Sequence, residues 1–228
     1  MFRLFFIALM TLSGSAEAAD SDMQQRLAAC QICHGEHGEG KSGNEYYPHL
    51  AGKPAGYLKS QLQAFRDGRR VYQQMNWLMR NMDDDYLQRI ADYYAALPPR
   101  SSAQAVNMSA DDAARARLLV ERGDVTAGIP ACSACHGDDL AGLEPDVPAL
   151  LGLPPDYVVA QLGAWRTGSR VAAAPDCMAA VSKALEPGDM RKLGEWLASQ
   201  GVAGSLQPAP AGSLALSPNC ALGVDSAR

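Results

Sequence analysis

The residues of this chain whose types and spacing could do chemistry lie in two short cysteine motifs. The first, Cys-Gln-Ile-Cys-His, spans residues 30–34, and the second, Cys-Ser-Ala-Cys-His, spans residues 132–136. Two thiols three residues apart can each form a thioether with a haem vinyl group, and the histidine that follows can bind the iron. One CxxC alone is as typical of a zinc or redox site, but two copies with matching flanks indicate two c-type haems. The expected attachment residues are Cys30, Cys33, Cys132 and Cys135, and the expected axial histidines are His34 and His136.

The overall composition is that of a globular protein. The chain has 228 residues, of which 47% are hydrophobic and 20% charged, and its formal net charge is -5. This length allows one or two domains. The sequence contains no basic stripe that could neutralise phosphates, so we expect no nucleic-acid partner.

The N-terminus has the features of a secretory signal peptide. Arg3 supplies a positive charge, residues 4–12 form an apolar stretch, and residues 16–18 give a small-x-small cleavage pattern. The apolar stretch is shorter than the roughly 20 residues that a spanning helix needs, and retention as an uncleaved anchor is the alternative. We expect a cleaved signal peptide at 1–19, a periplasmic location and no transmembrane span in the mature chain.

The two halves of the chain repeat one another. Tyr57, Gln61, Arg66, Gly68 and Arg70 each have the same residue type 100 positions later. Such a long internal match indicates two copies of one fold. Apolar residues at helical spacing predict helices over 54–67 and from about 84 in the first copy, and Pro98 should end the second of these. Ser109 and Asp112 form a capping-box-like start for the first helix of the second copy.

We therefore expect an all-α fold of two tandem domains, each wrapped around one haem. The expected bounds are 20–98 for the first domain, 99–108 for a polar linker, 109–200 for the second domain and 201–228 for an irregular tail.

The sixth ligand of each iron must come from elsewhere in the chain. His136 is the only histidine in the second half. The local candidates for the sixth ligand of the second iron are therefore a methionine, Cys177, a lysine or an open position. Met178 lies in an expected loop before the closing helix, whereas Met190 lies within that helix, where packing is the expected role. At the offset of 103 positions that aligns the closing helices, Met178 corresponds to Met75. We expect Met75 and Met178 as axial ligands, with Met79 as the alternative in the first domain.

Other polar residues of both copies could contact the haems. Arginines that recur could form bidentate hydrogen bonds with haem propionates or could be solvated charges at helix ends. These arginines are Arg66, Arg70, Arg166 and Arg170. His37 is too close to His34 to reach the opposite haem face, and His49 has Ala149 as its counterpart. We expect surface or hydrogen-bonding roles for both histidines.

Taken together, these motifs resemble the dihaem cytochrome c4 family. The resemblance covers roughly residues 20–200 and includes CxxCH-Gly, a Pro-x-Leu-x-Gly turn, a Tyr-x-x-x-Gln-Leu-x-x-aromatic-Arg helix, Gly-x-Arg and a methionine ahead of the closing helix. It implies two class I cytochrome c folds that face each other, His/Met iron in each, and periplasmic electron transfer toward a terminal oxidase. Glu36-His37 departs from the family pattern, which usually has a small or proline residue followed by Asp.

Cys177 and Cys220 remain after haem attachment, and they too are not general family features. In an oxidising compartment they can form a disulfide. A free Cys177 thiolate could instead replace Met178 at the second haem or carry a sulfur substrate.

These features predict an electron-transfer protein rather than a catalyst with its own substrate. A His/Met site closed on both faces keeps oxygen from binding and favours reduced iron. The expected partners are redox proteins: a donor dehydrogenase or cytochrome complex, and an acceptor oxidase. The alternative is the haem subunit of an oxidoreductase complex, or a dihaem enzyme, that acts on a small sulfur compound with Cys177 near the second haem.

Overall fold

The computed structural model describes residues 23–41, 44, 46–99, 103–201, 206–214 and 216. The expected signal peptide, most of the expected tail and Cys220 lie outside the described residues. The helices in chain order are α2 (Ala28–His34), α3 (Ala55–Arg66), α4 (Gln73–Met79), α5 (Asp84–Ala96), α6 (Ala110–Glu121), α7 (Ser133–His136), α8 (Pro155–Thr167), α9 (Cys177–Ala184) and α10 (Pro187–Ser199). Extended pairing in the described part is limited to isolated bridges, so the predicted all-α class is confirmed.

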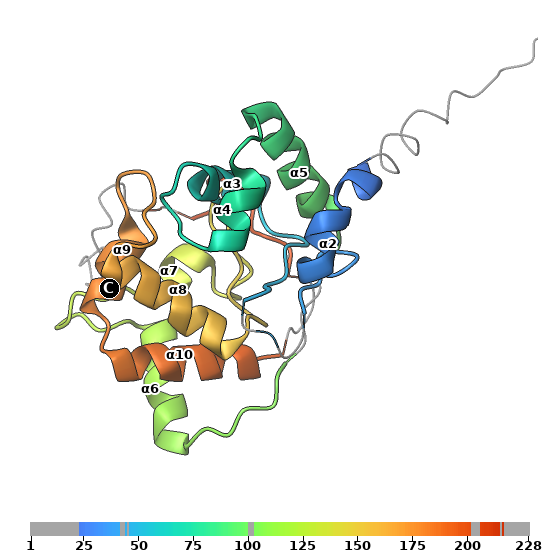
Figure 1. Ribbon diagram of the computed structural model, residues 1–228. Coiled ribbons are helices and arrows are strands. Elements are labelled where there is room, and N and C mark those ends of the chain that lie inside the picture. The colour runs from blue at the N-terminus through green and yellow to red at the C-terminus, as the bar shows by residue number, and fades with distance from the viewer. Residues whose placement is uncertain are drawn as a thin grey trace, which may run out of the picture.

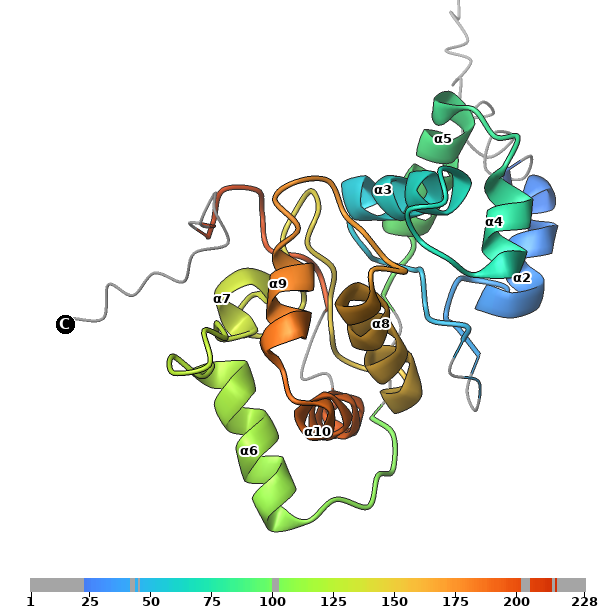
Figure 2. The ribbon, with the colours of Figure 1, turned by 60° about the vertical axis from the view of Figure 1, so that its left-hand side comes forward.

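The helices form two groups, each around its own apolar core. In the first half α3 packs against α4 and α5, and in the second half α10 packs against α6 and α8, while α8 also contacts α9. Figures 1 and 2 show α2–α5 together at one end of the molecule and α6–α10 together at the other. The internal repeat of the sequence therefore corresponds to two similar sets of helices.

Helix α5 illustrates how the sequence builds the first core. Its N-terminus is capped by Asp83, whose side chain accepts the Tyr86 N–H at 2.7 Å. Its apolar residues recur at helical spacing and are buried against α3. These residues are Leu87, Ile90, Ala91 and Tyr94. The helix ends at Ala96, before Pro98, as predicted from the inability of proline to continue a helix.

The second core is assembled in the same way and extends further along the chain. Ser109 caps α6 by accepting the Asp112 N–H at 3.1 Å, as the capping-box pattern predicts. Leu206, beyond the expected domain boundary at 200, is only 4% exposed and belongs to this core. The Ala209 N–H donates to the Gly142 carbonyl at 2.9 Å. A short piece of the expected tail therefore packs on the second half.

Short helices carry the two methionines expected as axial ligands, and for Met178 this replaces the expected loop. Met75 lies within α4, and α9 begins one residue before Met178. The Asp176 side chain caps α9 by accepting the Ala179 N–H at 3.1 Å. With seven and eight residues, these helices are too short to show the periodicity from which longer helices are predicted.

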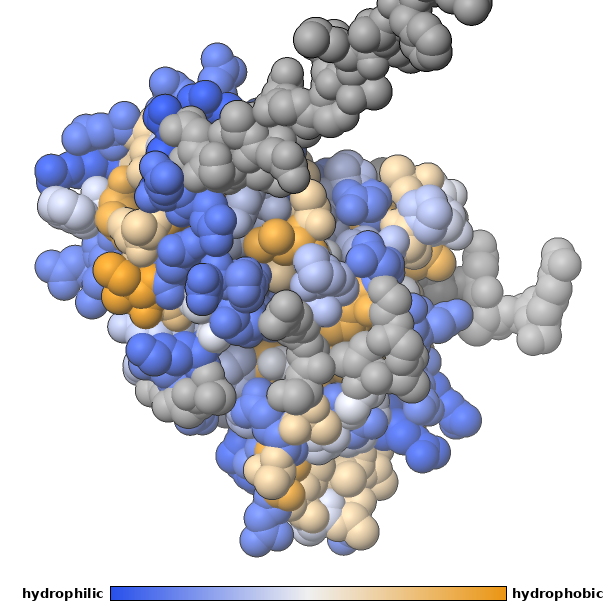
Figure 3. Space-filling view, turned by 90° about the vertical axis from the view of Figure 1, so that its right-hand side faces the viewer, coloured by the Kyte–Doolittle hydropathy of each residue, from blue (hydrophilic) through white to orange (hydrophobic). Residues whose placement is uncertain are grey.

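The described part of the chain has no helix that is long and apolar enough to cross a membrane. The face shown in Figure 3 is mainly hydrophilic, and its apolar patches are separated by polar side chains. Trp77 is exposed on α4, and the guanidinium of Arg80 lies 4.9 Å from the centre of its ring.

An ion pair between Arg115 of α6 and Asp189 of α10 ties two helices of the second half together. Arg115 donates to Oδ2 of Asp189 at 2.8 and 3.1 Å, and the Asp189 side chain is 8% exposed. We predict that Asp189→Asn lowers the free energy of unfolding by about 1–2 kcal/mol, because it removes a buried charge partner. Chemical denaturation at neutral pH measures this. The control Glu195→Gln, in an exposed pair with Arg191, should cost less than about 0.5 kcal/mol.

The same pair should make stability depend on pH. Burial raises the pKa of Asp189, but the hydrogen bonds and charge of Arg115 outweigh it and hold the pKa below its ordinary value. A carboxylate with a lowered folded pKa stabilises the fold above its unfolded pKa, and this contribution is lost as pH falls through the folded pKa. The stability difference between the wild type and Asp189→Asn should therefore shrink in acid. If the stability difference stays constant as the pH falls through the folded pKa of Asp189, the ion pair with Arg115 is not its source.

Candidate haem sites

The histidine of each CxxCH motif is held by a hydrogen bond to a backbone carbonyl. His34, the last residue of α2, has its Nδ1 2.9 Å from the carbonyl oxygen of Pro48. His136, the last residue of α7, has its Nδ1 2.8 Å from the carbonyl oxygen of Pro148. Because a carbonyl oxygen can only accept, Nδ1 carries the proton in both rings. Nε2 therefore keeps the lone pair with which it could bind iron.

Both imidazoles are buried, which favours the neutral form that binds metals. Burial lowers the pKa of His34, and the hydrogen bond to Pro48 only partly offsets this. The same two effects act on the pKa of His136, with Pro148 as the acceptor. None of the four motif cysteines forms a disulfide, so all are available for thioethers. Each motif thus offers two cysteines and a neutral imidazole to a haem.

After each motif the chain forms a tight loop, which brings the carbonyl of Pro48 or Pro148 next to the motif histidine. The Gly40 N–H donates to the His34 carbonyl at 2.7 Å, and the Gly142 N–H donates to the His136 carbonyl at 2.9 Å. Gly142 has a φ of 94°, and a Cβ there would collide with the Val147 carbonyl oxygen. Glycine is needed at this position for both the positive φ and the close approach.

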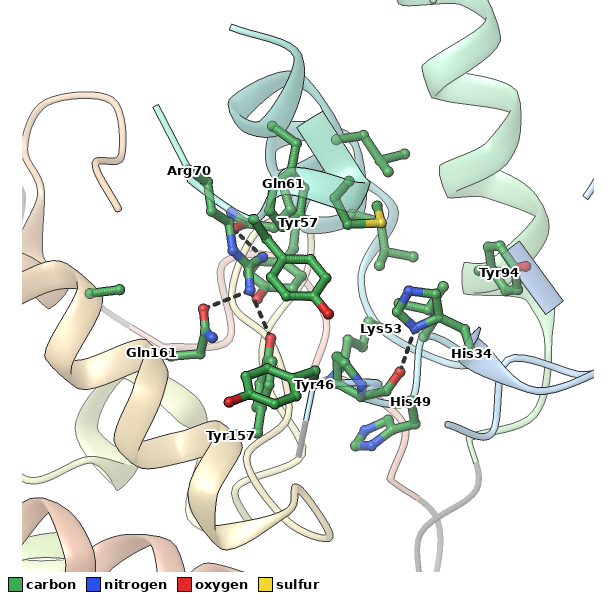
Figure 4. A pocket seen from close by; sticks show the side chains of 18 of the residues that line it. His34, Tyr46, His49, Lys53, Tyr57, Gln61, Arg70, Tyr94, Tyr157 and Gln161 are labelled. Atoms are coloured by element: carbon green, nitrogen blue, oxygen red, sulfur yellow. Dashed lines mark hydrogen bonds between the residues drawn. The ribbon is translucent and has the colours of Figure 1, made fainter. Parts of the chain in front are cut away.

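A cavity of about 220 Å³ lies beside His34 in the first half (Figure 4). Met75 also lines it, whereas Met79 does not line it and is 1% exposed within the apolar core. Apolar side chains of α3 and α5 form much of its wall, and Tyr157 and Gln161 of the second half close one side. The cavity therefore brings together the predicted axial pair of the first site.

The second half contains the corresponding residues for a site at His136. Met178 is partly buried and packs against the second core. Trp165 stands at the repeat position of Phe65, which lines the first cavity. The Nε1–H of Trp165 is buried and has no hydrogen-bond partner in the described structure. Such orphaned donors are rare and costly, and a haem carboxylate could accept this one, so the residues of the second site fit a haem.

Two arginines join the halves through a reciprocal set of hydrogen bonds, part of which Figure 4 shows. Arg70 donates to Gln61 of its own half at 2.9 Å and to Gln161 of the other half at 2.7 Å. Arg170 donates to Gln161 at 2.9 Å and to Gln61 at 2.7 Å. The remaining acceptors are the hydroxyls of Tyr157 for Arg70, at 2.9 Å, and of Tyr57 for Arg170, at 3.2 Å. The backbones at Arg70 and Arg170 also pair as an antiparallel bridge.

We call the contact between the halves around Arg70 and Arg170 the junction, and buried positive charge is concentrated there. Arg70, Arg170 and Lys53 are 8%, 4% and 5% exposed, and none forms an ion pair with a carboxylate of the described residues. Buried cations are normally paired with an anion. The propionates of haems bound in both halves would supply the missing negative charge, so the junction also fits haems on its two sides.

The four arginines predicted as propionate contacts divide into two pairs. Arg70 and Arg170 meet at the junction. Arg66 instead donates to the Asp84 side chain at 2.6 Å, and Arg166 donates to the carbonyl at the C-terminal end of α9 at 2.5 Å. Arg66 does not line the cavity. Arg66 and Arg166 therefore hydrogen-bond near the connection between α4 and α5 in the first half and between α9 and α10 in the second.

The weaker histidine candidates and the extra cysteines have different surroundings. His37 is exposed, but a surface role is wrong for His49, which is 4% exposed and lines the first cavity. Burial lowers the pKa of His49 well below its ordinary value. Cys177 is disulfide-bonded. Cys220 lies outside the described residues, so the pairing of the two stays a prediction.

Comparison with known proteins identifies the family. A family model described as cytochrome c matches residues 24–114. A thiosulfate dehydrogenase electron acceptor from Thiomonas intermedia is 34% identical over 201 residues, which are 88% of this chain and 92% of that protein. Cytochrome c4 from Pseudomonas aeruginosa is 34% identical over 176 residues, which are 75% of this chain and 84% of that protein. The chain belongs to the dihaem cytochrome c4 family.

Solved structures agree with this family. The crystal structure of reduced cytochrome c4 from Pseudomonas stutzeri has a TM-score of 0.68 and 27% identity, and covers 82% of this chain and 99% of that one. The thiosulfate dehydrogenase TsdBA from Marichromatium purpuratum has a TM-score of 0.68 and 34% identity, and covers 77% of this chain. This chain spans 37% of the length of that enzyme chain. The cytochrome c4-type fold consists of two tandem class I cytochrome c domains, and its cofactors are c-type haems.

The junction residues of this cytochrome c4-type protein were missed as a site by sequence reasoning. The sequence indicated Tyr57 and Gln61 only as members of the repeat and indicated no role for Lys53. The recurrence of Tyr, Gln and Arg 100 positions apart was the available signal. It shows that both copies keep these residues, but it does not show that the two sets meet.

The shared glutamine should be important for holding the two halves together. Gln61 Oε1 accepts from both Arg70 and Arg170, so Gln61→Leu removes acceptors from two buried cations. We predict a loss of about 2–3 kcal/mol in the free energy of unfolding of the haem-containing protein, measured by chemical denaturation. Gln63→Leu on the same helix, whose partner Asp84 is at the surface, is the matched control. Equal losses for both variants would show that the reciprocal bonds add nothing.

Proposed function

We propose that this protein is a periplasmic dihaem electron carrier that accepts electrons from a thiosulfate-oxidising dehydrogenase and passes them to a terminal oxidase or similar acceptor. The observation that carries the proposal is the 34% identity to the Thiomonas thiosulfate dehydrogenase electron acceptor over 92% of that protein. The two buried, neutral histidines and the cationic junction support two haem sites in one chain. Export through a signal peptide at 1–19 and domains near 20–98 and 109–200 belong to the same proposal.

In this proposal each half holds one haem through its own motif. Cys30 and Cys33 would hold the first haem through thioethers, and Cys132 and Cys135 would hold the second. His34 with Met75, and His136 with Met178, would bind the two irons. When bound, each haem supplies a one-electron ferric/ferrous couple. The Pro48 and Pro148 carbonyls fix the histidine rings, which limits rearrangement of these residues between oxidation states.

A carrier fits these residues better than an enzyme with its own sulfur substrate. The enzyme alternative depends on a free thiolate at Cys177. Cys177 is disulfide-bonded, and a disulfide sulfur has no thiolate with which to hold a substrate or replace Met178. The sulfur chemistry is therefore assigned to the donor dehydrogenase.

The methionine assignment is tested by comparing two methionines of α4. We predict that Met75→Ala removes the methionine-to-iron charge-transfer band of one haem and opens that ferrous haem to carbon monoxide, because its sixth ligand is lost. Visible spectra and carbon monoxide titration of the purified protein measure both effects. Met79→Ala should keep both haem spectra but lower the free energy of unfolding by about 2–5 kcal/mol, because Met79 is fully buried. Loss of the band in Met79→Ala instead would reverse the assignment.

The electron donor is tested by reconstitution. We predict that a purified thiosulfate dehydrogenase with thiosulfate rapidly reduces both haems of this protein, as followed by visible absorbance. Thiosulfate alone should leave the haems oxidised on the same timescale. Turnover of thiosulfate by this protein without the dehydrogenase would favour the enzyme reading. No reduction in the complete mixture would mean that the protein serves another donor.

A further inference from the structure

Helix α9, which carries Met178, also buries a serine hydroxyl that has no partner. Ser182 is 0% exposed, and its Oγ forms no hydrogen bond within the described structure. Its backbone is bonded, because Arg166 donates to the Ser182 carbonyl oxygen at 3.4 Å. A buried hydroxyl without an acceptor destabilises a fold, and such groups are rare in native proteins. This hydroxyl therefore indicates an acceptor that is in place only when the second site is complete.

The first half shows that packing alone does not require a polar group at this position. At the offset of 103 positions that aligns Met75 with Met178, Ser182 corresponds to Met79. Met79 is 1% exposed and belongs to the first apolar core. Both copies thus bury the residue four positions after the expected ligand methionine, but only the second copy places a hydrogen-bond donor there.

The geometry of α9 directs this hydroxyl toward Met178. Residues four apart lie on the same face of an α-helix, with Cβ atoms about 5–6 Å apart, and each Cβ is tilted toward the N-terminus of the helix. Ser182 therefore leans toward the turn that holds Met178, which is itself partly buried against the second core.

Met178 offers this hydroxyl two acceptors. The usual acceptor for a serine within a helix is the carbonyl oxygen four residues earlier, which here belongs to Met178, but this hydrogen bond is not formed. The other acceptor is the thioether sulfur, which accepts hydrogen bonds weakly. It is also the atom that is expected to change its position when the second site is complete.

We infer that Ser182 is a positioning residue for the second haem site, and that its hydroxyl donates a hydrogen bond to the Met178 sulfur when that sulfur binds iron. A thioether sulfur has two lone pairs, so one can bind the metal while the other accepts from the hydroxyl. The hydrogen bond fixes which lone pair faces the iron. It is lost when the methionine leaves the iron, so it favours the ligated state. This inference rests on the proposed ligation of the second iron by His136 and Met178.

The test is displacement of the axial methionines by imidazole in the oxidised dihaem protein at fixed pH. Loss of the methionine-to-iron charge-transfer band follows the displacement, and paramagnetic NMR of the methionine methyl groups assigns it to each haem. For Ser182→Ala we expect displacement of Met178 at about threefold to tenfold lower imidazole concentration, which is the effect of one net hydrogen bond. Displacement of Met75 should not change. The methyl resonance of Met178 should also shift, because the orientation of its sulfur is no longer fixed.

Two further variants separate this hydrogen bond from the general effects of losing a hydroxyl. Ser199→Ala removes a half-buried hydroxyl from α10 of the same half, where it donates to the Trp196 carbonyl at 2.7 Å. Imidazole displacement at both haems should be unchanged in this variant. Ser182→Thr keeps a hydroxyl at the position and should bring displacement of Met178 back toward the wild type.

The outcomes distinguish this inference from the proposed function. The inference is overturned if Ser182→Ala leaves displacement at the second haem unchanged, or shifts it equally at both haems. It is also overturned if Ser182→Ala makes the dihaem protein more stable to chemical denaturation, because removing a hydroxyl that has no acceptor stabilises a fold. If the wild-type protein shows no methionine methyl resonance for the second haem, the proposed ligation fails independently of Ser182.

Discussion

Two guanidinium groups lie buried where two copies of one fold meet, and the constraint that they need acceptors organises the molecule. Each glutamine oxygen serves both Arg70 and Arg170, so neither copy can satisfy its own arginine without the other. Leaving a buried charged donor unpaired costs more than a neutral one. The hydrogen bonds therefore hold α3 and α8 in a fixed relation and place buried positive charge between the halves, with Arg70 and Lys53 on the wall of the cavity beside His34.

The sequence was sufficient for the parts of the fold that depend on local chemistry. The caps at Asp83 and Ser109 and the apolar spacing of α5 are local signals, and each helix formed where it was predicted. The CxxCH motifs and the repeat likewise predicted two haem sites, and the offset of 103 positions selected Met75, which lines the cavity with His34. These signals are contained within short segments or within the comparison of one copy with the other.

What the sequence could not predict depends on contacts between the copies or on very short elements. For His49 a surface or a hydrogen-bonding role was open, and the structure excludes the surface role because the side chain is 4% exposed and lines the first cavity. A repeat spacing shows that Tyr57 and Tyr157 are equivalent, yet it does not show that each bonds the arginine of the opposite half. The helices α4 and α9 have too few residues for their periodicity to be recognised.

The differences between the copies are as informative as the repeat. Lys53 and His49 in the first half correspond to Leu153 and Ala149 in the second, and Phe65 corresponds to Trp165. Around Met178, the Asp176 cap and the disulfide at Cys177 restrain the start of α9. This restraint agrees with the ligand role proposed for Met178, and in that proposal Cys177 supports an electron-transfer site rather than catalysis.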